Sequence, residues 1–208
     1  MPKIPKRSIG IRYYFLKEIN PLIRLIIIAD ILIVGGTAML APIFALFIEG
    51  FIEGGNEQVA GISVALFLIT KSLFQIPIAT LLDRVRGEKD DFAVLVTFSL
   101  LMSLTPLLYL LISQPWQLYL VQILLGFFTA MTFPSFMAIF TRHIDKSQEG
   151  TEWGIYFTLS DLVAASLAAI GGYIAYTIGF HVLIMVVVSV SSTGSLMLLS
   201  IKPYIRKR

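Results

Sequence analysis

The sequence predicts an all-α membrane protein that crosses the bilayer six times. Three observations lead to this fold class: an apolar composition, six long apolar runs, and basic residues confined to alternate connections between the runs. Hydrophobic residues make up 57% of the 208 residues and charged residues only 14%, against roughly 25% charged residues in soluble domains. The composition therefore excludes an ordinary soluble domain.

The apolar runs have the length that a membrane-spanning helix requires. A helix rises 1.5 Å per residue, so about 20 residues cross the hydrocarbon core. Long continuous runs fit helices better than the alternating strands of a barrel. The six runs are 21–48, 59–82, 92–113, 117–140, 153–178 and 181–201. We predict one six-helix domain over residues 21–201, a basic segment before it at 1–20, and a basic tail after it at 202–208.

The basic residues predict the orientation of these helices. If both termini lie on one side of the membrane, every Lys and Arg except Lys71 falls on that side. The connections on the other side contain Glu49, Glu53 and Glu57 but no Lys or Arg. By the positive-inside rule we predict cytoplasmic termini and a location in the inner or plasma membrane of the cell. The basic residues are spread over four segments, which does not indicate a nucleic-acid partner.

The first and fourth apolar runs share a sequence pattern. When "DILIVGGTAMLAPIF" (30–44) is set above "QILLGFFTAMTFPSF" (122–136), a Thr-Ala-Met triplet followed by Pro matches in both. An offset shorter by two residues then pairs Lys71 with Asp161. Because the first and fourth helices would cross in opposite directions, we predict two inverted three-helix repeats, a plan common among secondary transporters. Four prolines are expected to break helices: Pro42, Pro77, Pro106 and Pro134.

The connection between the second and third runs, "IATLLDRVRGEKDDF" (78–92), is densely charged. It resembles the signature loop of the major facilitator superfamily, whose pattern is Gly-x-Leu-Ala-Asp-Arg-x-Gly-Arg-Arg. Asp83 and Arg84 match the Asp and the first basic position, and Gly87 matches the Gly one residue late. The chain departs from the pattern at Ala79, which stands for Gly, and at Arg86, which is an insertion.

A second family pattern, Arg-x-x-Gln-Gly in the fourth helix, survives only as Gly126, with Gln122 at the Arg position.

This resemblance implies half of a transporter, because members of the family have two six-helix bundles and this sequence has one. It implies a parallel homodimer whose two copies build a twelve-helix cavity lined by Thr37, Gln122 and Thr129. It also implies a gate at the signature loop, formed by Asp83, Arg84, Arg86 and Gly87, in which Asp83 clamps the start of a helix across the interface. The alternative is that these charges only anchor the loop in the cytoplasm.

Three charged residues lie inside apolar runs: Asp30, Lys71 and Asp161. An unpaired charge at such a depth costs about 2.5 to 3.5 kcal/mol, so each must pair, change protonation or face water. The family sets its second helix against the fifth helix of the other bundle, so we predict Lys71–Asp161 pairs across the dimer. Asp30 then has no obvious partner and is predicted to couple transport to protons. A static Lys71–Asp161 pair and an Asp30 that faces inner water are the structural alternatives.

No enzyme motif is visible. The sequence lacks His-Glu-x-x-His, Gly-x-Ser-x-Gly and a phosphate-binding glycine loop with Lys, and it has no cysteine. We therefore expect no enzymatic activity, cofactor or metal site, and the lipid bilayer and a small molecule as partners. The function predicted is secondary active transport, with uniport as an open alternative. The sequence is also compatible with a non-transport subunit for assembly or lipid handling, and with half of a longer transporter; Met1 and the basic closing segment favour a complete chain.

Overall fold

The computed structural model describes Leu16 and residues 19–84, 87–146 and 148–205. The chain is all-helical over these residues, and the prediction of six helices long and apolar enough to cross a membrane is confirmed. The first span is α2 (Pro21–Ala38), η1 (Ala41–Ile43) and α3 (Phe44–Phe51). The remaining spans are α4 (Glu57–Arg84), α5 (Glu88–Leu104) with η2 (Thr105–Leu110), α6 (Pro115–His143), α7 (Glu149–Thr177), and α8 (Phe180–Met197) with η3 (Leu198–Tyr204).

Several helices begin outside the apolar runs because polar residues satisfy their first backbone groups. α5 begins at Glu88, and three acidic residues occupy its first turn, where carboxylates interact favourably with the positive end of the helix dipole. Asn20 precedes α2, and its side chain accepts a hydrogen bond from the Leu22 amide, as N-cap residues do. Gln114 and Gln117 form a capping box at the start of α6.

Two of the four prolines interrupt their helices. Pro42 lies in η1, between α2 and α3, and Pro106 lies in η2 after α5. Pro77 and Pro134 lie inside α4 and α6, which continue past them, so the predicted breaks at these two positions are wrong. A proline removes one backbone hydrogen bond, and a long membrane helix packed against its neighbours tolerates that loss.

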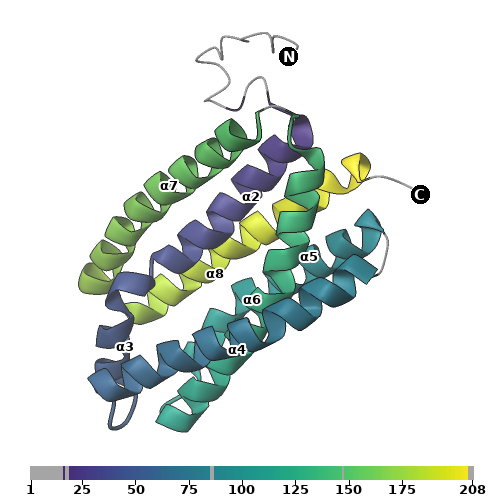
Figure 1. Cartoon of the computed structure of the whole chain (residues 1–208). Helices are drawn as coiled ribbons and strands as arrows, with labels where there is room; N and C mark the ends of the chain where they lie inside the picture. The colour runs from purple at the N-terminus through teal and green to yellow at the C-terminus, as the bar shows by residue number, and fades with distance from the viewer. Residues whose placement is uncertain (1–15, 17–18, 85–86, 147, 206–208) are drawn as a thin grey trace.

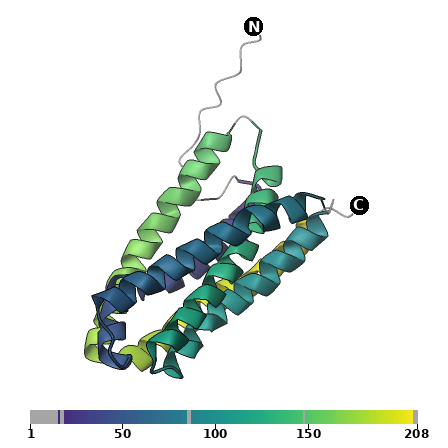
Figure 2. The same cartoon turned by 60° about the horizontal axis from the view of Figure 1, so that its bottom comes forward.

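The helices pack in a pattern that relates the first three spans to the last three. α2 packs along α7 and α8, while α6 packs along α4 and α5. Exchanging the first three spans with the last three leaves this pattern unchanged, as the predicted inverted repeat requires, although the repeat itself stays a prediction. α4 and α7 lie on opposite sides of the bundle, with α2, α6 and α8 between them (Figure 1). In the turned view (Figure 2) the two helices diverge toward the side on which the termini are marked.

Glycines permit close contact at three helix pairs. A Cβ atom on Gly194 of α8 would lie 2.5 Å from the Ala29 carbonyl oxygen of α2. On Gly171 of α7 it would lie 2.2 Å from the Met39 carbonyl oxygen, and on Gly126 of α6 it would lie 2.6 Å from the backbone oxygen of α4 residue Phe67. Small residues that let backbones approach are typical of helix pairs in membranes.

α4 and α7 are the least buried helices. In their most apolar stretches only 17% of residues are buried, against 44% in the first and last spans. Ile76 of α4 and Leu162 of α7 are among the large apolar side chains left exposed. Such surfaces suit lipid or another membrane helix.

Candidate functional site

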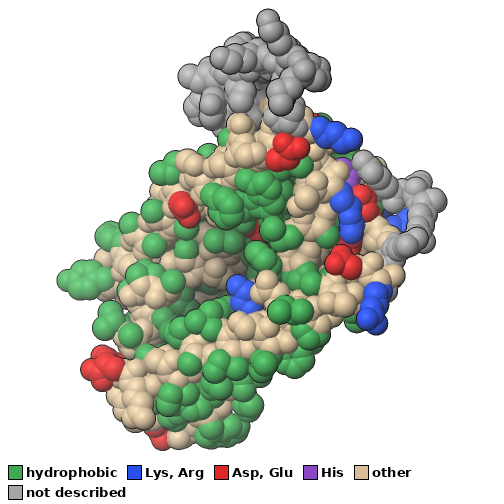
Figure 3. Space-filling model, viewed as in Figure 1, with side chains coloured by type: hydrophobic (Ala, Val, Ile, Leu, Met, Phe, Trp, Pro, Cys, Tyr) green, Lys and Arg blue, Asp and Glu red, His purple; other side chains and the backbone are tan. Residues whose placement is uncertain are grey.

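One face of the bundle is hollowed between α7 and α4 (Figure 3). Hydrophobic side chains cover much of this face, and charged side chains gather toward the end at which α2 begins. We call that end the Arg142 end; it is formed by the first turns of α2 and α5 and the last turns of α4 and α6. Three features on this face and its floor concern the predicted site residues: a carboxyl–tyrosine contact, a pocket, and a cleft at the Arg142 end.

Asp30 has a polar partner that the sequence did not reveal. The Tyr156 hydroxyl of α7 donates a hydrogen bond to Asp30 Oδ2 of α2, with an O···O distance of 2.7 Å. The expectation that Asp30 has no obvious partner is therefore wrong. The sequence did not show the partner because Tyr156 is 126 residues away along the chain. The Tyr156 ring also packs against Trp153 and Phe157, with centroid distances of 5.8 and 5.0 Å.

Lys71 and Asp161 do not meet within the chain. Lys71 Nζ lies 5.4 Å from the centroid of the Phe133 ring, a distance that fits a cation–π contact. No described carboxylate lies within ion-pair distance of Lys71, and Asp161 is exposed on α7. α4 and α7 share no extended contact. The described residues therefore show no static Lys71–Asp161 pair inside one chain, and the pair across a dimer stays a prediction.

A second feature, which we call the inner pocket, has a volume of about 290 Å³. It is lined by residues of the first span and of α4, η2, α6 and α8. Gln122 Nε2 donates a hydrogen bond to the Tyr109 hydroxyl oxygen at 3.1 Å, and both side chains are about 5% exposed. Thr37 also lines the pocket. Thr129, predicted with Thr37 and Gln122 to line a cavity, is not among the lining residues, which are Thr37, Leu40, Ala41, Phe44, Val64, Phe67, Pro106, Tyr109, Gln122, Leu125 and Val187.

Thr129 and Tyr109 show what the sequence pattern missed. The Thr129 hydroxyl donates to the Leu125 carbonyl oxygen at 2.8 Å and lies 3.5 Å from Met102 Sδ of α5. Thr37, at the equivalent position of the first run, likewise donates to a carbonyl oxygen of its own helix, that of Val34, but it lines the pocket. Equivalent positions in the two repeats therefore differ in their access to the pocket. Tyr109 lies inside the apolar run 92–113, and nothing in the local sequence distinguishes it from the apolar residues around it.

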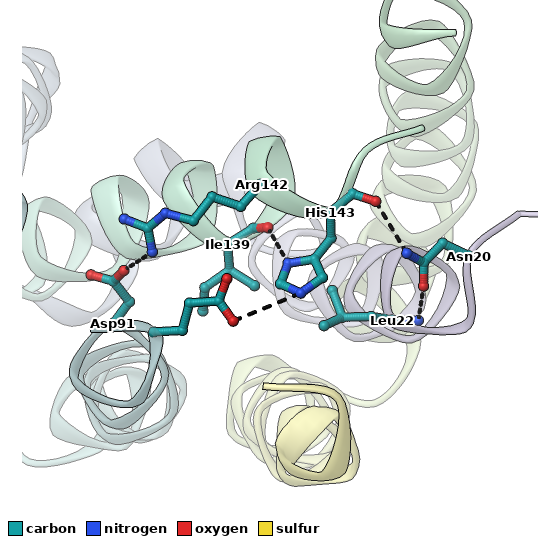
Figure 4. A network of polar contacts seen from close by, with 7 residues as sticks. Asn20, Leu22, Asp91, Ile139, Arg142 and His143 are labelled. Carbon is teal, nitrogen blue, oxygen red and sulfur yellow. Dashed lines mark hydrogen bonds and ion pairs between the residues drawn. The ribbon is translucent and has the colours of Figure 1, made fainter. Parts of the chain in front are cut away.

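Polar contacts tie three helices together at the Arg142 end (Figure 4). The Arg142 guanidinium of α6 donates to the Asp91 carboxylate of α5. His143 Nε2 lies 3.7 Å from Glu88 Oε2, and the His143 carbonyl oxygen accepts a hydrogen bond from Asn20 Nδ2 at 3.1 Å. The starts of α2 and α5 are thereby fastened to the end of α6.

The signature loop lies beside this network. Asp83 and Arg84 end α4 and are exposed, and Gly87 precedes α5 with extended backbone. Arg86 lies outside the described residues. Asp83 and Arg142 line the α4–α6 cleft, which has a volume of about 560 Å³. A clamp across an interface needs a second bundle, so the gate role of this loop stays a prediction.

Comparison with known proteins agrees with this architecture. The family model of the Major Facilitator Superfamily matches residues 26–207, which include all six membrane spans in whole or in large part. No curated protein gives a significant match. Members of this family are membrane transporters, and the six apolar helices make the chain an integral, multi-pass membrane protein. The chain belongs to the major facilitator superfamily.

Proposed function

We propose that this chain is a secondary active transporter of a small solute, that two copies form a parallel homodimer with alternating access, and that transport is coupled to protons at Asp30. The observation that carries the proposal is Asp30 itself. It is a carboxyl group within a membrane-spanning helix, with a tyrosine hydroxyl and no described cation as its partner. Intramembrane carboxyl groups of this kind mark ion and proton pathways.

The dimer rests on the open faces of α4 and α7. A two-fold axis along the membrane normal would set α4 of one copy against α7 of the other, as in the two halves of larger family members. Lys71 and Asp161 would then form two symmetric pairs, in which Coulomb attraction competes with the cost of desolvation. The same arrangement would give the hollowed face a second wall.

The coupling step follows from the chemistry of a carboxyl group. Enclosing Asp30 in an apolar surrounding during the change of access costs less when its carboxyl group is neutral than when it is charged. In its charged form Asp30 can hold a cationic group in place of the proton. Tyr156 would orient the carboxyl group by its hydroxyl hydrogen bond. By the positive-inside rule the Arg142 end faces the cytoplasm, and the signature loop with Asp83 would gate that side.

A second candidate is that the chain is one half of a longer twelve-helix transporter. The open faces of α4 and α7 favour it as much as they favour a homodimer, because a second bundle on the same chain would cover them equally. The mass of the native gene product decides between the two. Proton coupling at Asp30 is proposed for both arrangements.

Transport measurements test the role of Asp30. A thermal-shift ligand screen identifies a solute, and proteoliposomes then measure its uptake. In Asp30→Asn, uphill accumulation driven by a pH gradient should be lost, while solute exchange at equilibrium should be largely retained. Ser189→Ala is the matched control, since the Ser189 hydroxyl is exposed and bonds only to Met185 of its own helix. Uphill accumulation by Asp30→Asn would show that Asp30 is not the coupling residue.

Crosslinking tests the dimer. The chain has no cysteine, so only introduced thiols react. Leu68 and Ala165 are exposed and lie about one turn from Lys71 and Asp161 respectively. Leu68→Cys in one tagged copy and Ala165→Cys in another should crosslink in lipid, whereas Leu196→Cys on α8 should not crosslink to either. A strict monomer with full transport activity would reject the homodimer.

A further inference from the structure

The inner pocket offers a binding chemistry that the proton-coupling role of Asp30 does not use. It includes residues of η2 and α8 as well as residues of α2, α4 and α6, so all but one of the six membrane spans contribute to it. Thr37 in its wall is seven residues after Asp30, which places the two on the same face of α2 about 10 Å apart along the axis. The pocket is therefore within reach of a solute held near Asp30.

The lining of the pocket indicates a neutral ligand. No Asp, Glu, Lys, Arg or His is among the lining residues. An ionised group in this apolar surrounding would have no counter-charge and would lose its hydration, which is unfavourable. The group that enters the pocket should therefore be uncharged.

The polar pair in the pocket leaves one donor and one acceptor available. The Tyr109 hydroxyl oxygen accepts a hydrogen bond from Gln122 Nε2, but no described residue accepts the hydroxyl hydrogen. No described residue donates to the Gln122 side-chain carbonyl oxygen either. Both residues are about 5% exposed, so a ligand in the pocket can take the place of water at these two groups. A ligand with a carbonyl oxygen would accept the hydrogen bond that Tyr109 can donate.

The size and walls of the pocket narrow the class further. Its volume of about 290 Å³ is roughly twice the 150 Å³ of a cavity that holds benzene, so it fits a group with about two fused rings. Phe44 and Phe67 contribute aromatic walls, and the Phe44 and Tyr109 ring centroids are 5.8 Å apart. Aromatic ligands pack favourably against such rings.

We propose that the inner pocket binds the neutral, ring-containing part of the transported solute, and that a carbonyl oxygen on this part accepts a hydrogen bond from the Tyr109 hydroxyl. The proposal deepens the proposed transport function and rests on it. It assigns the solute to amphipathic molecules with an aromatic ketone or amide. Tyr109 is the residue that selects the carbonyl group.

Thiol protection in lipid nanodiscs measures occupancy of the pocket. Val64 lies in the pocket wall and is 47% exposed, so Val64→Cys should react with N-ethylmaleimide and be protected by a bound ligand. The probe is 2-acetylnaphthalene, and its matched control is 2-isopropenylnaphthalene, in which CH₂ replaces the carbonyl oxygen. The ketone should give half-maximal protection at a concentration about three- to tenfold lower than the alkene, the range expected for one hydrogen bond.

Variants then assign this preference to Tyr109. Tyr109→Phe, in the Val64→Cys background, should abolish the preference for the ketone while the alkene protects as before. Ser189→Ala removes an exposed hydroxyl that does not line the pocket, so it should retain the preference. Thr80→Cys, in the α4–α6 cleft, should not be protected by either compound.

Three results would overturn the proposal: equal protection by ketone and alkene in the parent, a ketone preference that survives Tyr109→Phe, or equal protection of Thr80→Cys. The assay uses no ion gradient, so it is independent of the Asp30→Asn transport measurement. A ketone preference without any uphill transport by the parent would refute the transport function alone. Uphill transport without a ketone preference would refute the pocket alone.

Discussion

Two regions of the molecule differ in whether their charged side chains form ion pairs within the chain. At the Arg142 end, Asp91 is almost completely buried and is paired with Arg142 inside the chain. In α4 and α7, Lys71 and Asp161 have no described ion-pair partner. The fold of one copy thus supplies the ion pair at the Arg142 end, whereas an ion pair for Lys71 or Asp161 requires a partner outside the bundle. The contrast separates the residues expected to stabilise one copy from those expected to act in assembly and transport.

The packing of the helices follows the same division. The first and last spans are the most buried, and the close contact of α2 with α8 at Gly194 joins them. α4 packs mainly on α6 and α7 mainly on α2, and both expose large apolar residues. Substitutions should therefore cost most where backbones touch and least at the exposed charges of α4 and α7.

The largest effect is expected at Gly171, where the α7 backbone lies against the end of α2. A methyl group there would lie 2.2 Å from the Met39 carbonyl oxygen, so Gly171→Ala must displace backbone and should lower the free energy of unfolding by about 3 kcal/mol. The adjacent Gly172 has no atom within 4 Å of such a methyl group. Gly172→Ala should be neutral or stabilising by up to about 1 kcal/mol. Thermal unfolding in detergent measures both, and equal melting temperatures for the two variants would refute the contact.

The next effect concerns the closed charge pair. Arg142→Ala leaves the Asp91 carboxylate buried without its cation and should destabilise the protein by about 2 kcal/mol. This is less than for a fully buried pair, because the Arg142 side chain is 38% exposed. Asp91→Asn in the same background should recover part of the loss. Lys89→Ala, at an exposed position of the same helix, should change stability by less than about 0.5 kcal/mol. A double variant as unstable as the sum of both singles would exclude the pairing.

A smaller effect is expected at Asn20. Its side chain caps α2 and also donates to the His143 carbonyl oxygen. Asn20→Ala should cost about 1 kcal/mol and increase hydrogen exchange in the first turn of α2. Asn20→Asp keeps the capping oxygen but not the donor, so it should lie between Asn20→Ala and the parent. Unchanged exchange in Asn20→Ala would show that the cap contributes nothing.

The smallest effect on the stability of a single copy is expected for Lys71→Ala and Asp161→Ala. Because neither residue has a described ion-pair partner within the chain, each should change the unfolding free energy in detergent by less than about 0.5 kcal/mol. In lipid, each single variant should weaken crosslinking between Leu68→Cys and Ala165→Cys copies, since it leaves one charge unpaired at the interface. The double variant should crosslink better than either single variant. If it is as defective as the sum of the two, the pair does not form.

Local sequence features were enough to predict the number of membrane spans and most of the signature loop. Both depend on local properties: the length of an apolar run decides whether a helix can cross the bilayer, and residues such as Asp83 and Arg84 match a family pattern by their order alone. The match of the family model over residues 26–207 agrees with that resemblance. Several helices begin just before the apolar runs, and capping residues such as Gln114, at the start of α6, account for these polar starts.

Which side chains meet, in contrast, depends on how the helices pack together. Tyr156 reaches Asp30 across 126 residues, Arg142 reaches Asp91 across 51, and Gln122 reaches Tyr109 across 13. These contacts depend on how each helix is rotated about its axis. In soluble helices an apolar stripe reveals that rotation, but the spans here are apolar all round. Their rotation is set instead by close contacts at residues such as Gly171 and Gly194, which become recognisable only when the helices are packed together.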